Sequence, residues 1–121
     1  DYRPAVRAEN KIKKEQHDHL NIELTENPDI LYGLGQKKTH QFLVGFAAET
    51  RDVIEYGKAK LAKKNLNLLV ANDVAQQGAG FNVSTNIAAL IYKDGHIEQY
   101  PKMTKDDLGH IIIEKIAEGI N

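Results

Sequence analysis

The stretch Phe42-Leu-Val-Gly-Phe46-Ala-Ala-Glu-Thr50 decides the fold that this sequence predicts. Its apolar residues and single glycine are typical of a buried strand, and Ala47 and Ala48 predict a turn with little side-chain bulk before a helix opens. In open α/β sheets, ligands bind in the crevice beyond the carboxyl ends of the strands. We therefore expect a small-molecule site around residues 46–50.

Composition limits the class of protein. The 121 residues suffice for about one domain, and 41% hydrophobic with 27% charged residues is typical of a globular protein. No apolar run approaches the roughly 18 residues of a membrane-spanning helix, so we expect no membrane association. Sixteen basic and seventeen acidic residues give a net charge of −1, so no global field attracts nucleic acid, and anions would need local lysine clusters.

The sequence contains no cysteine, which excludes disulfides, thiolate zinc sites and a cysteine nucleophile, and which fits the cytoplasm. No signal peptide is recognisable before Asp1. Because there is also no initiator methionine, we expect the chain to be a piece of a longer protein.

Residues 1–20 show no period of 2 or 3.6 and predict a loop. The run Lys11-Ile-Lys-Lys14 would suit phosphate groups near a crevice, but its spacing alone favours a solvated charge run. His17-Asp-His19 offers two imidazoles to a metal, and without a third ligand nearby a solvated loop is the preferred interpretation.

Two short elements are expected before the central strand. Residues 21–25 alternate apolar and polar like an edge strand, and Asn27-Pro28-Asp29-Ile30 turns the chain into one or two helical turns over residues 31–35. As a turn and helix cap, this tetrapeptide needs no function.

A helix is expected after the central strand, from Glu49 or Thr50 to Lys64. Its apolar face repeats every four residues, at Val53, Gly57 and Leu61. Lys60 and Lys64 lie one turn apart near its carboxyl end, where cations interact favourably with the helix dipole. Without other information, that structural role is the preferred interpretation of both lysines.

A second buried strand is expected over residues 66–71, with Asn72-Asp73 at its carboxyl end. A strand, a helix and a strand within about thirty residues predict a right-handed parallel crossover. The segment Gln76-Gln-Gly-Ala-Gly80-Phe81 predicts a flexible loop. It is not a dinucleotide fingerprint, because its glycines open no helix.

The carboxyl-terminal third predicts a hairpin and a helix. Residues 86–92 and 97–100 flank an Asp-Gly turn, and Thr104 caps the last helix in the Thr-x-x-Asp107 pattern. The apolar face of this helix is expected at Leu108, Ile112, Ile116 and Ile120. The histidines are scattered, and no serine-histidine-acid or paired-carboxylate arrangement follows from spacing. The residues alone indicate an α/β domain that binds a nucleotide or phosphate.

The order of these motifs resembles that of the bacterial phosphopantothenate–cysteine ligases, also called phosphopantothenoylcysteine synthetases. The resemblance spans the whole chain and rests on Asp1-Tyr-Arg-Pro4, Lys11-Ile-Lys-Lys14, Asn27-Pro28-Asp29-Ile30, Val44-Gly-Phe46-Ala-Ala-Glu49-Thr50, Lys60 with Lys64, Ala71-Asn72-Asp73-Val74 and Gly80-Phe81. It implies that residues 1–121 are the carboxyl-terminal part of the synthetase domain of a bifunctional coenzyme A biosynthesis protein. The implied fold is a three-layer, Rossmann-like or ribokinase-like parallel sheet with an added β-hairpin, lacking its N-terminal half.

The resemblance implies a cytoplasmic, homodimeric ligase that uses CTP with Mg²⁺. CTP activates the carboxylate of 4′-phosphopantothenate as an acyl-cytidylate and releases pyrophosphate, and the amine of cysteine then displaces CMP. The substrate amine is the nucleophile, so the protein would supply positioning and charge stabilisation.

The resemblance also implies roles for individual residues. Lys11 would contact phosphate and act in the activation step, and no residue is expected to bind a metal directly. The implied nucleotide-binding residues are Asp1, Lys11, Asn27, Pro28, Asp29, Ile30, Phe46, Lys60 and Lys64. The region from Gly78 to Asn86 resembles the start of the hairpin through which the family dimerises, although Asn82-Val-Ser-Thr departs from the usual serine-aspartate pair.

Two absences shape the expectation for activity. The chain lacks the family's preceding half-domain, with its glycine- and serine-rich phosphate loop and an asparagine that handles the acyl-cytidylate. It also lacks the FMN-dependent decarboxylase domain that many bacterial versions carry. We therefore expect no complete reaction from the chain alone, and a nucleotide-binding or dimerisation module without catalysis is the alternative. A nicotinamide or flavin oxidoreductase is disfavoured, because no Gly-x-Gly-x-x-Gly joins a strand to a helix.

Overall fold

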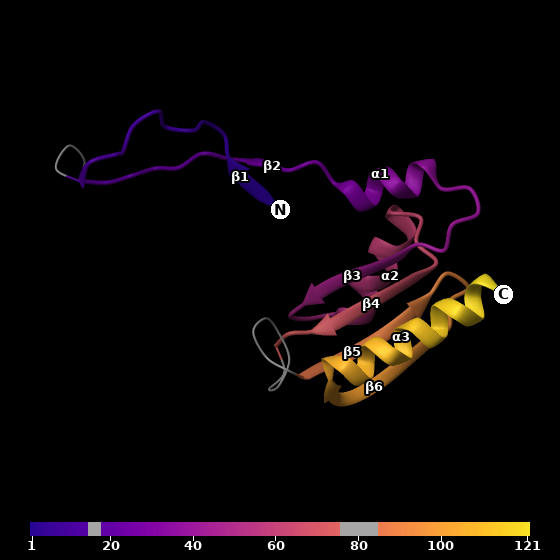
Figure 1. Cartoon of the computed structure of the whole chain (residues 1–121). Helices are drawn as coiled ribbons and strands as arrows, with labels where there is room; N and C mark the ends of the chain where they lie inside the picture. The colour runs from indigo at the N-terminus through magenta and orange to yellow at the C-terminus, as the bar shows by residue number, and fades with distance from the viewer. Residues whose placement is uncertain (15–17, 76–84) are drawn as a thin grey trace.

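The computed structural model describes residues 1–14, 18–75 and 85–121. An extended N-terminal arm leads into an α/β body, in which a twisted sheet lies between two helices (Figure 1). The elements in chain order are β1 (Tyr2–Pro4), β2 (Leu24–Glu26), α1 (Ile30–Lys37), β3 (Val44–Glu49), α2 (Val53–Lys63), β4 (Leu68–Asp73), β5 (Thr85–Tyr92), β6 (Ile97–Thr104) and α3 (Lys105–Ile120). No helix in the described ranges is long and apolar enough to cross a membrane.

The sheet of the body has the strand order β3-β4-β5-β6. The crossover through α2 makes β3 and β4 parallel, with Val44 opposite Leu68 and Glu49 opposite Asp73. The remaining pairs, β4 with β5 and β5 with β6, are antiparallel. The predicted three-layer α/β fold, a parallel pair extended by a hairpin, is confirmed.

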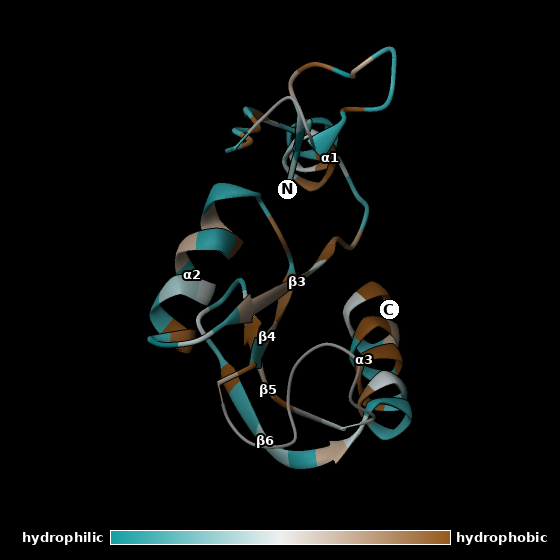
Figure 2. Cartoon of the chain, turned by 90° about the vertical axis from the view of Figure 1, so that its left-hand side faces the viewer, coloured by the Kyte–Doolittle hydropathy of each residue, from teal (hydrophilic) through white to brown (hydrophobic). Residues whose placement is uncertain are grey.

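The core lies on both faces of β4, because its side chains alternate between the two helices. Leu69 and Ala71 pack with Leu61 of α2 on one face. Leu68 and Val70 pack with α3 on the other. Figure 2 shows α2 and α3 on opposite sides of the sheet. A strand that is buried on both faces has a continuous apolar sequence, which is why β4 could be predicted from its residues.

The central strand is longer than the sequence predicted. Ala47 and Ala48 are not a turn but part of β3, where they pair with Ala71 and Asn72 of β4. The turn instead lies before Asp52, whose φ of 48° breaks the extended backbone, and the helix starts at Val53 rather than at residue 49 or 50. Gly45 and Ala47 are buried on one face of β3, where a Cβ at Gly45 would meet the side chains of Leu66 and Leu31, whereas Ala48 is exposed on the other face.

The N-terminal arm also differs from prediction. Residues 1–20 are not all loop, because Tyr2–Pro4 forms β1 and pairs antiparallel with β2, placing Tyr2 opposite Glu26. The predicted strand at residues 21–25 begins only at Leu24. Each strand has three residues, too few to show a period. The helix predicted at residues 31–35 spans Ile30–Lys37.

The hairpin and the last helix are largely as predicted. Gly95 adopts a φ of 94°, which the tight turn requires and which glycine tolerates. Thr104 caps α3 by accepting a hydrogen bond of 3.1 Å from the Asp107 amide. The prediction that Ile120 is buried is wrong, since it is 65% exposed. A four-residue spacing drifts by about 40° per step on a helix, so the fourth position leaves the buried face.

Candidate functional site

A polar pocket of about 590 Å³ lies where the base of the arm, the start of α1, strand β3 and the end of α2 meet. Its lining combines carboxylates, lysines and a turn with the aromatic side chain of Phe46. Two other pockets, of about 690 Å³ in the arm and about 530 Å³ between β3 and α3, have mainly apolar linings. The polar pocket is therefore the described cavity best suited to a charged ligand.

The polar pocket brings together seven of the nine residues predicted to bind a nucleotide. These are Asp1, Asn27, Pro28, Asp29, Ile30, Phe46 and Lys64. They come from four separate segments, because Asp1 lies beside Asn27 through the β1–β2 pairing, where the Asn27 amide donates to the Asp1 carbonyl at 2.8 Å. The arm hairpin thus folds the first residue of the chain back to the pocket.

Asp29 has two roles at the pocket. Its Oδ1 caps α1 by accepting a hydrogen bond of 3.0 Å from the Tyr32 amide. Its Oδ2 lies 3.4 Å from the Lys64 ammonium. The Tyr32 hydrogen bond, assisted by Lys64, holds the pKa of the Asp29 carboxyl below its ordinary value. Asp29 is therefore ionised at neutral pH and connects α1 with the carboxyl end of α2.

Lys60 lies outside the polar pocket. Its ammonium pairs with Glu49 Oε1 at 2.6 Å, at the carboxyl end of β3. This places Lys60 one helical turn before the pocket lysines, and its predicted contact with a nucleotide stays a prediction.

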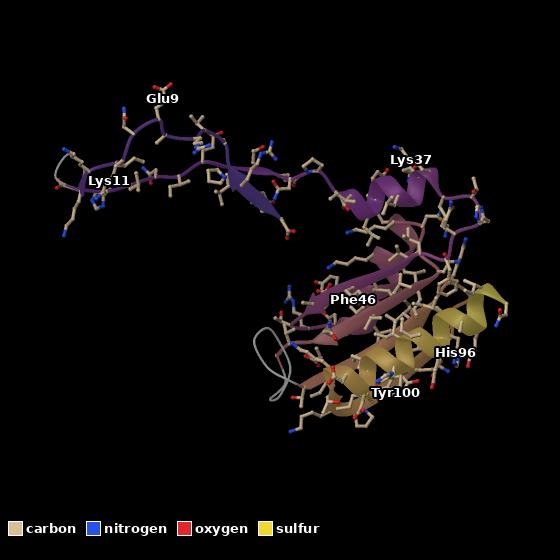
Figure 3. All side chains as sticks on the ribbon, in the orientation of Figure 1. Glu9, Lys11, Lys37, Phe46, His96 and Tyr100 are labelled. Atoms are coloured by element: carbon tan, nitrogen blue, oxygen red, sulfur yellow. The ribbon has the colours of Figure 1, made fainter. Side chains whose placement is uncertain are left out.

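Lys11 lies along the arm, well away from Phe46 on β3 (Figure 3). It is exposed, and it does not line the polar pocket of its own chain. Its predicted catalytic role stays a prediction. Some predictions concern residues outside the described ranges. These are the loop at residues 76–81, residues 82–84 of the Asn82-Val-Ser-Thr segment, which differs from the usual family motif, and His17.

Sequence reasoning missed four residues that line the pocket: Tyr2, Glu26, Leu31 and Lys63. Lys63 could have been predicted from the sequence, because it is a further lysine in the last turn of the helix that carries Lys60 and Lys64. Tyr2 belongs to the motif Asp1-Tyr-Arg-Pro4 but was given no role there, and Glu26 had no signal, because the two residues meet only through pairing across the arm. No group of three side chains that could hold a metal ion occurs among the residues described.

Comparison with known proteins places the chain in a family. The family model of the DNA/pantothenate metabolism flavoprotein C-terminal domain matches residues 1–120. The chain belongs to this family. Within it, the chain is 48% identical over 117 residues to the coenzyme A biosynthesis bifunctional protein CoaBC of Bacillus subtilis, covering 97% of the chain and 29% of that protein. It is 44% identical over 120 residues to CoaBC of Escherichia coli K12, with coverages of 97% and 29%.

Solved structures agree with this membership. The crystal structure of the C-terminal domain of CoaBC superposes with a TM-score of 0.72 at 37% identity, covering 96% of the chain and 47% of that structure. The DNA/pantothenate metabolism flavoprotein from Streptococcus pneumoniae gives a TM-score of 0.63 at 22% identity over 81% of the chain and 42% of that structure, which supports the fold alone. The chain thus spans less than a third of the CoaBC relatives and about half of the solved domain.

Proposed function

We propose that this chain forms the nucleotide-binding part of a CTP-dependent phosphopantothenate–cysteine ligase in cytoplasmic coenzyme A biosynthesis. The observation that carries the proposal is the polar pocket, which gathers seven residues that the family resemblance assigns to the nucleotide. Family membership and the CoaBC relatives support the same pathway.

The charges of the pocket suit a nucleoside triphosphate with a metal ion. Lys63 and Lys64 offer two ammonium groups to phosphate oxygens, which form strong charge-assisted hydrogen bonds. Mg²⁺ is commonly held by one or two carboxylates together with substrate phosphates. Asp1 lines the pocket and would be such a carboxylate, in departure from the expectation that no residue binds a metal directly, so a separate cluster of protein ligands is not needed.

The proposed reaction has two steps. A carboxylate oxygen of 4′-phosphopantothenate attacks the α-phosphorus of CTP, and the bond to pyrophosphate breaks. The amine of cysteine then attacks the acyl carbon, loses a proton and displaces CMP. Negative charge grows on the leaving oxygens in the first step, and lysines fixed beside them lower its barrier.

Calorimetric titration of the chain with CTP and Mg²⁺ tests the proposal. Lys64→Met should raise the Kd at least tenfold, because it removes an ammonium from the pocket. Lys58→Met is the matched control, since this exposed lysine of the same helix does not line the pocket. Absence of CTP binding by a chain with native circular dichroism, or equal losses in both variants, would overturn the proposal.

A second candidate is a nucleotide-binding module without catalysis, and the coverage of only 29% of the CoaBC relatives favours it for this chain. Pyrophosphate release with CTP, 4′-phosphopantothenate and cysteine separates the two. We expect binding without release from the chain alone. Release at the rate of a full-length relative would eliminate the module interpretation.

The proposal includes a homodimer. The arm exposes large apolar side chains, among them Val6 at 83%, Ile22 at 63% and Leu24 at 55%. Such side chains are typical of interaction surfaces, and a second copy would cover them. Sedimentation velocity should report a dimer, and a Val6→Asp, Ile22→Asp variant should be monomeric. A monomeric parent chain would refute this part of the proposal.

A further inference from the structure

Two helices form opposing walls of the polar pocket. Asp29, Ile30 and Leu31 belong to the start of α1, whereas Lys63 and Lys64 belong to the end of α2. The ion pair between Asp29 and Lys64 is partly exposed and therefore contributes little to holding α1 in place. Leu31 packs on the core at this end of the helix, and polar contacts hold the other end.

The helices are joined more extensively at the other end of α1. Lys38 follows the last residue of the helix, and its ammonium donates to the Asn65 carbonyl at 2.7 Å and to Asn67 Oδ1 at 2.9 Å. The Asn65 side-chain amide donates to the Gly35 carbonyl at 2.9 Å. Asn67 Oδ1 also accepts from the Leu43 amide at 2.8 Å, which links the cluster to the start of the sheet.

The geometry of the cluster leaves little freedom. Gly35 packs so closely on the end of α2 that a Cβ there would lie 1.9 Å from the Lys64 carbonyl oxygen. Asn65 adopts the left-handed conformation, with a φ of 56°, and this turns its side chain back toward α1. Burial lowers the pKa of the Lys38 ammonium, so its directed hydrogen bonds are made in a partly dehydrated place.

We propose that the cluster of Lys38, Asn65 and Asn67 positions the nucleotide pocket by fixing α1 against the end of α2. This inference rests on the proposed function. None of the three residues lines the pocket, so they act through Asp29 and Lys64 and are positioning residues.

The length of α1 makes a small tilt at the cluster into a larger displacement at the pocket. Asp29 and Lys38 are separated by nine residues, which is about 13 Å along a helix. A tilt of roughly 5° at the cluster would displace Asp29 by about 1 Å. A misplacement of about 1 Å can cost about 10²-fold in catalytic rate, and we expect a smaller loss in nucleotide affinity.

The test compares Lys38→Met with Lys38→Arg in the full chain. The methionine variant should raise the Kd for CTP with Mg²⁺ about tenfold, and arginine, which still donates, should restore most of the affinity. Lys37→Met is the control, because Lys37 directly precedes Lys38 in the chain and is exposed on α1 (Figure 3). In a Lys64→Met background the effect of Lys38→Met should shrink, because the two act on the same contact. Additive losses would contradict the positioning role.

A second measurement keeps the inference testable without CTP. In NMR spectra of the unliganded chain, Lys38→Met should shift the backbone amides of Ile30 and Leu31, at the far end of α1, and Lys37→Met should not. A merely local role would confine the changes to residues near Lys38. Unchanged far-end amides would overturn the inference, whereas failure of the parent chain to bind CTP would overturn only the proposed function.

Discussion

Two glycines of α1 offer a matched test of the contact between α1 and α2. A Cβ at Gly35 would lie 1.9 Å from the Lys64 carbonyl oxygen, whereas a Cβ at Gly33 would meet nothing within 4 Å. Both glycines lie within the same helix, Ile30–Lys37. Gly33→Ala and Gly35→Ala therefore add the same atoms to one helix and differ in what those atoms meet.

The magnitudes follow from the geometry. Alanine is favoured over glycine within a helix by about 1 kcal/mol, so Gly33→Ala should increase the free energy of unfolding by about 0.5–1 kcal/mol. At Gly35 the Cβ must retreat from 1.9 Å to beyond 3.0 Å, and the obstacle is backbone. Overpacking of this kind costs about 1–3 kcal/mol, and separation of the helices also weakens the Asn65 hydrogen bond. We expect Gly35→Ala to be destabilised by about 1–2 kcal/mol overall.

Thermal unfolding followed by circular dichroism measures the difference. At about 4 °C per kcal/mol for a domain of this size, the melting temperatures of the two variants should differ by roughly 6–12 °C. Gly35→Ala should also bind CTP more weakly than Gly33→Ala. Equal melting temperatures would show that α1 does not pack on the end of α2, and the Lys38, Asn65 and Asn67 cluster could then not fix the position of α1.

Three other predictions concern the body. Thr104→Ala should lower the free energy of unfolding by about 1 kcal/mol in urea titrations, because the Asp107 amide loses its cap. Leu90→Ala should lower it by about 2–5 kcal/mol, since this side chain is fully buried against α3. The hydrogen bond to Glu98 and burial raise the pKa of Tyr100 to about 12. The folded state thus retains a proton that the unfolded chain loses above pH 10, so stability should fall between pH 10 and 12 by at most about 1.4 kcal/mol per pH unit, and less steeply in Tyr100→Phe.

The body was predictable where local pattern and tertiary environment agree. The apolar run of β4 is buried on both faces, and the turn at Gly95 and the cap at Thr104 are chemical signals that act within a few residues. The boundary between β3 and α2 was not predictable in this way. Ala47 and Ala48 look like turn residues in the sequence, but pairing with β4 extends the strand through them.

In the candidate site, too, local features could be predicted from the sequence and contacts between distant residues could not. The turn around Asp29 could be located from its sequence, and the family resemblance named it as a nucleotide contact. The pairing of Asp29 with Lys64 joins residues far apart in the chain, and only the fold reveals it. The hydrogen bonds of Lys38 had no sequence signal, because its partners Asn65 and Asn67 lie about thirty residues away in the chain.

Phe46 connects the two kinds of surface on this edge of the sheet. Its side chain is 62% exposed, and it lines both the polar pocket and the apolar groove between β3 and α3. A nucleotide has the same division, with charged phosphates at one end and an apolar ring face at the other. In the proposed function, the lysines at the end of α2 would contact the phosphates, and the Phe46 ring would offer a stacking surface for the base. β3 is the edge strand of the described sheet, so Phe46 lies on a strand whose outer edge has no neighbouring strand among the described residues.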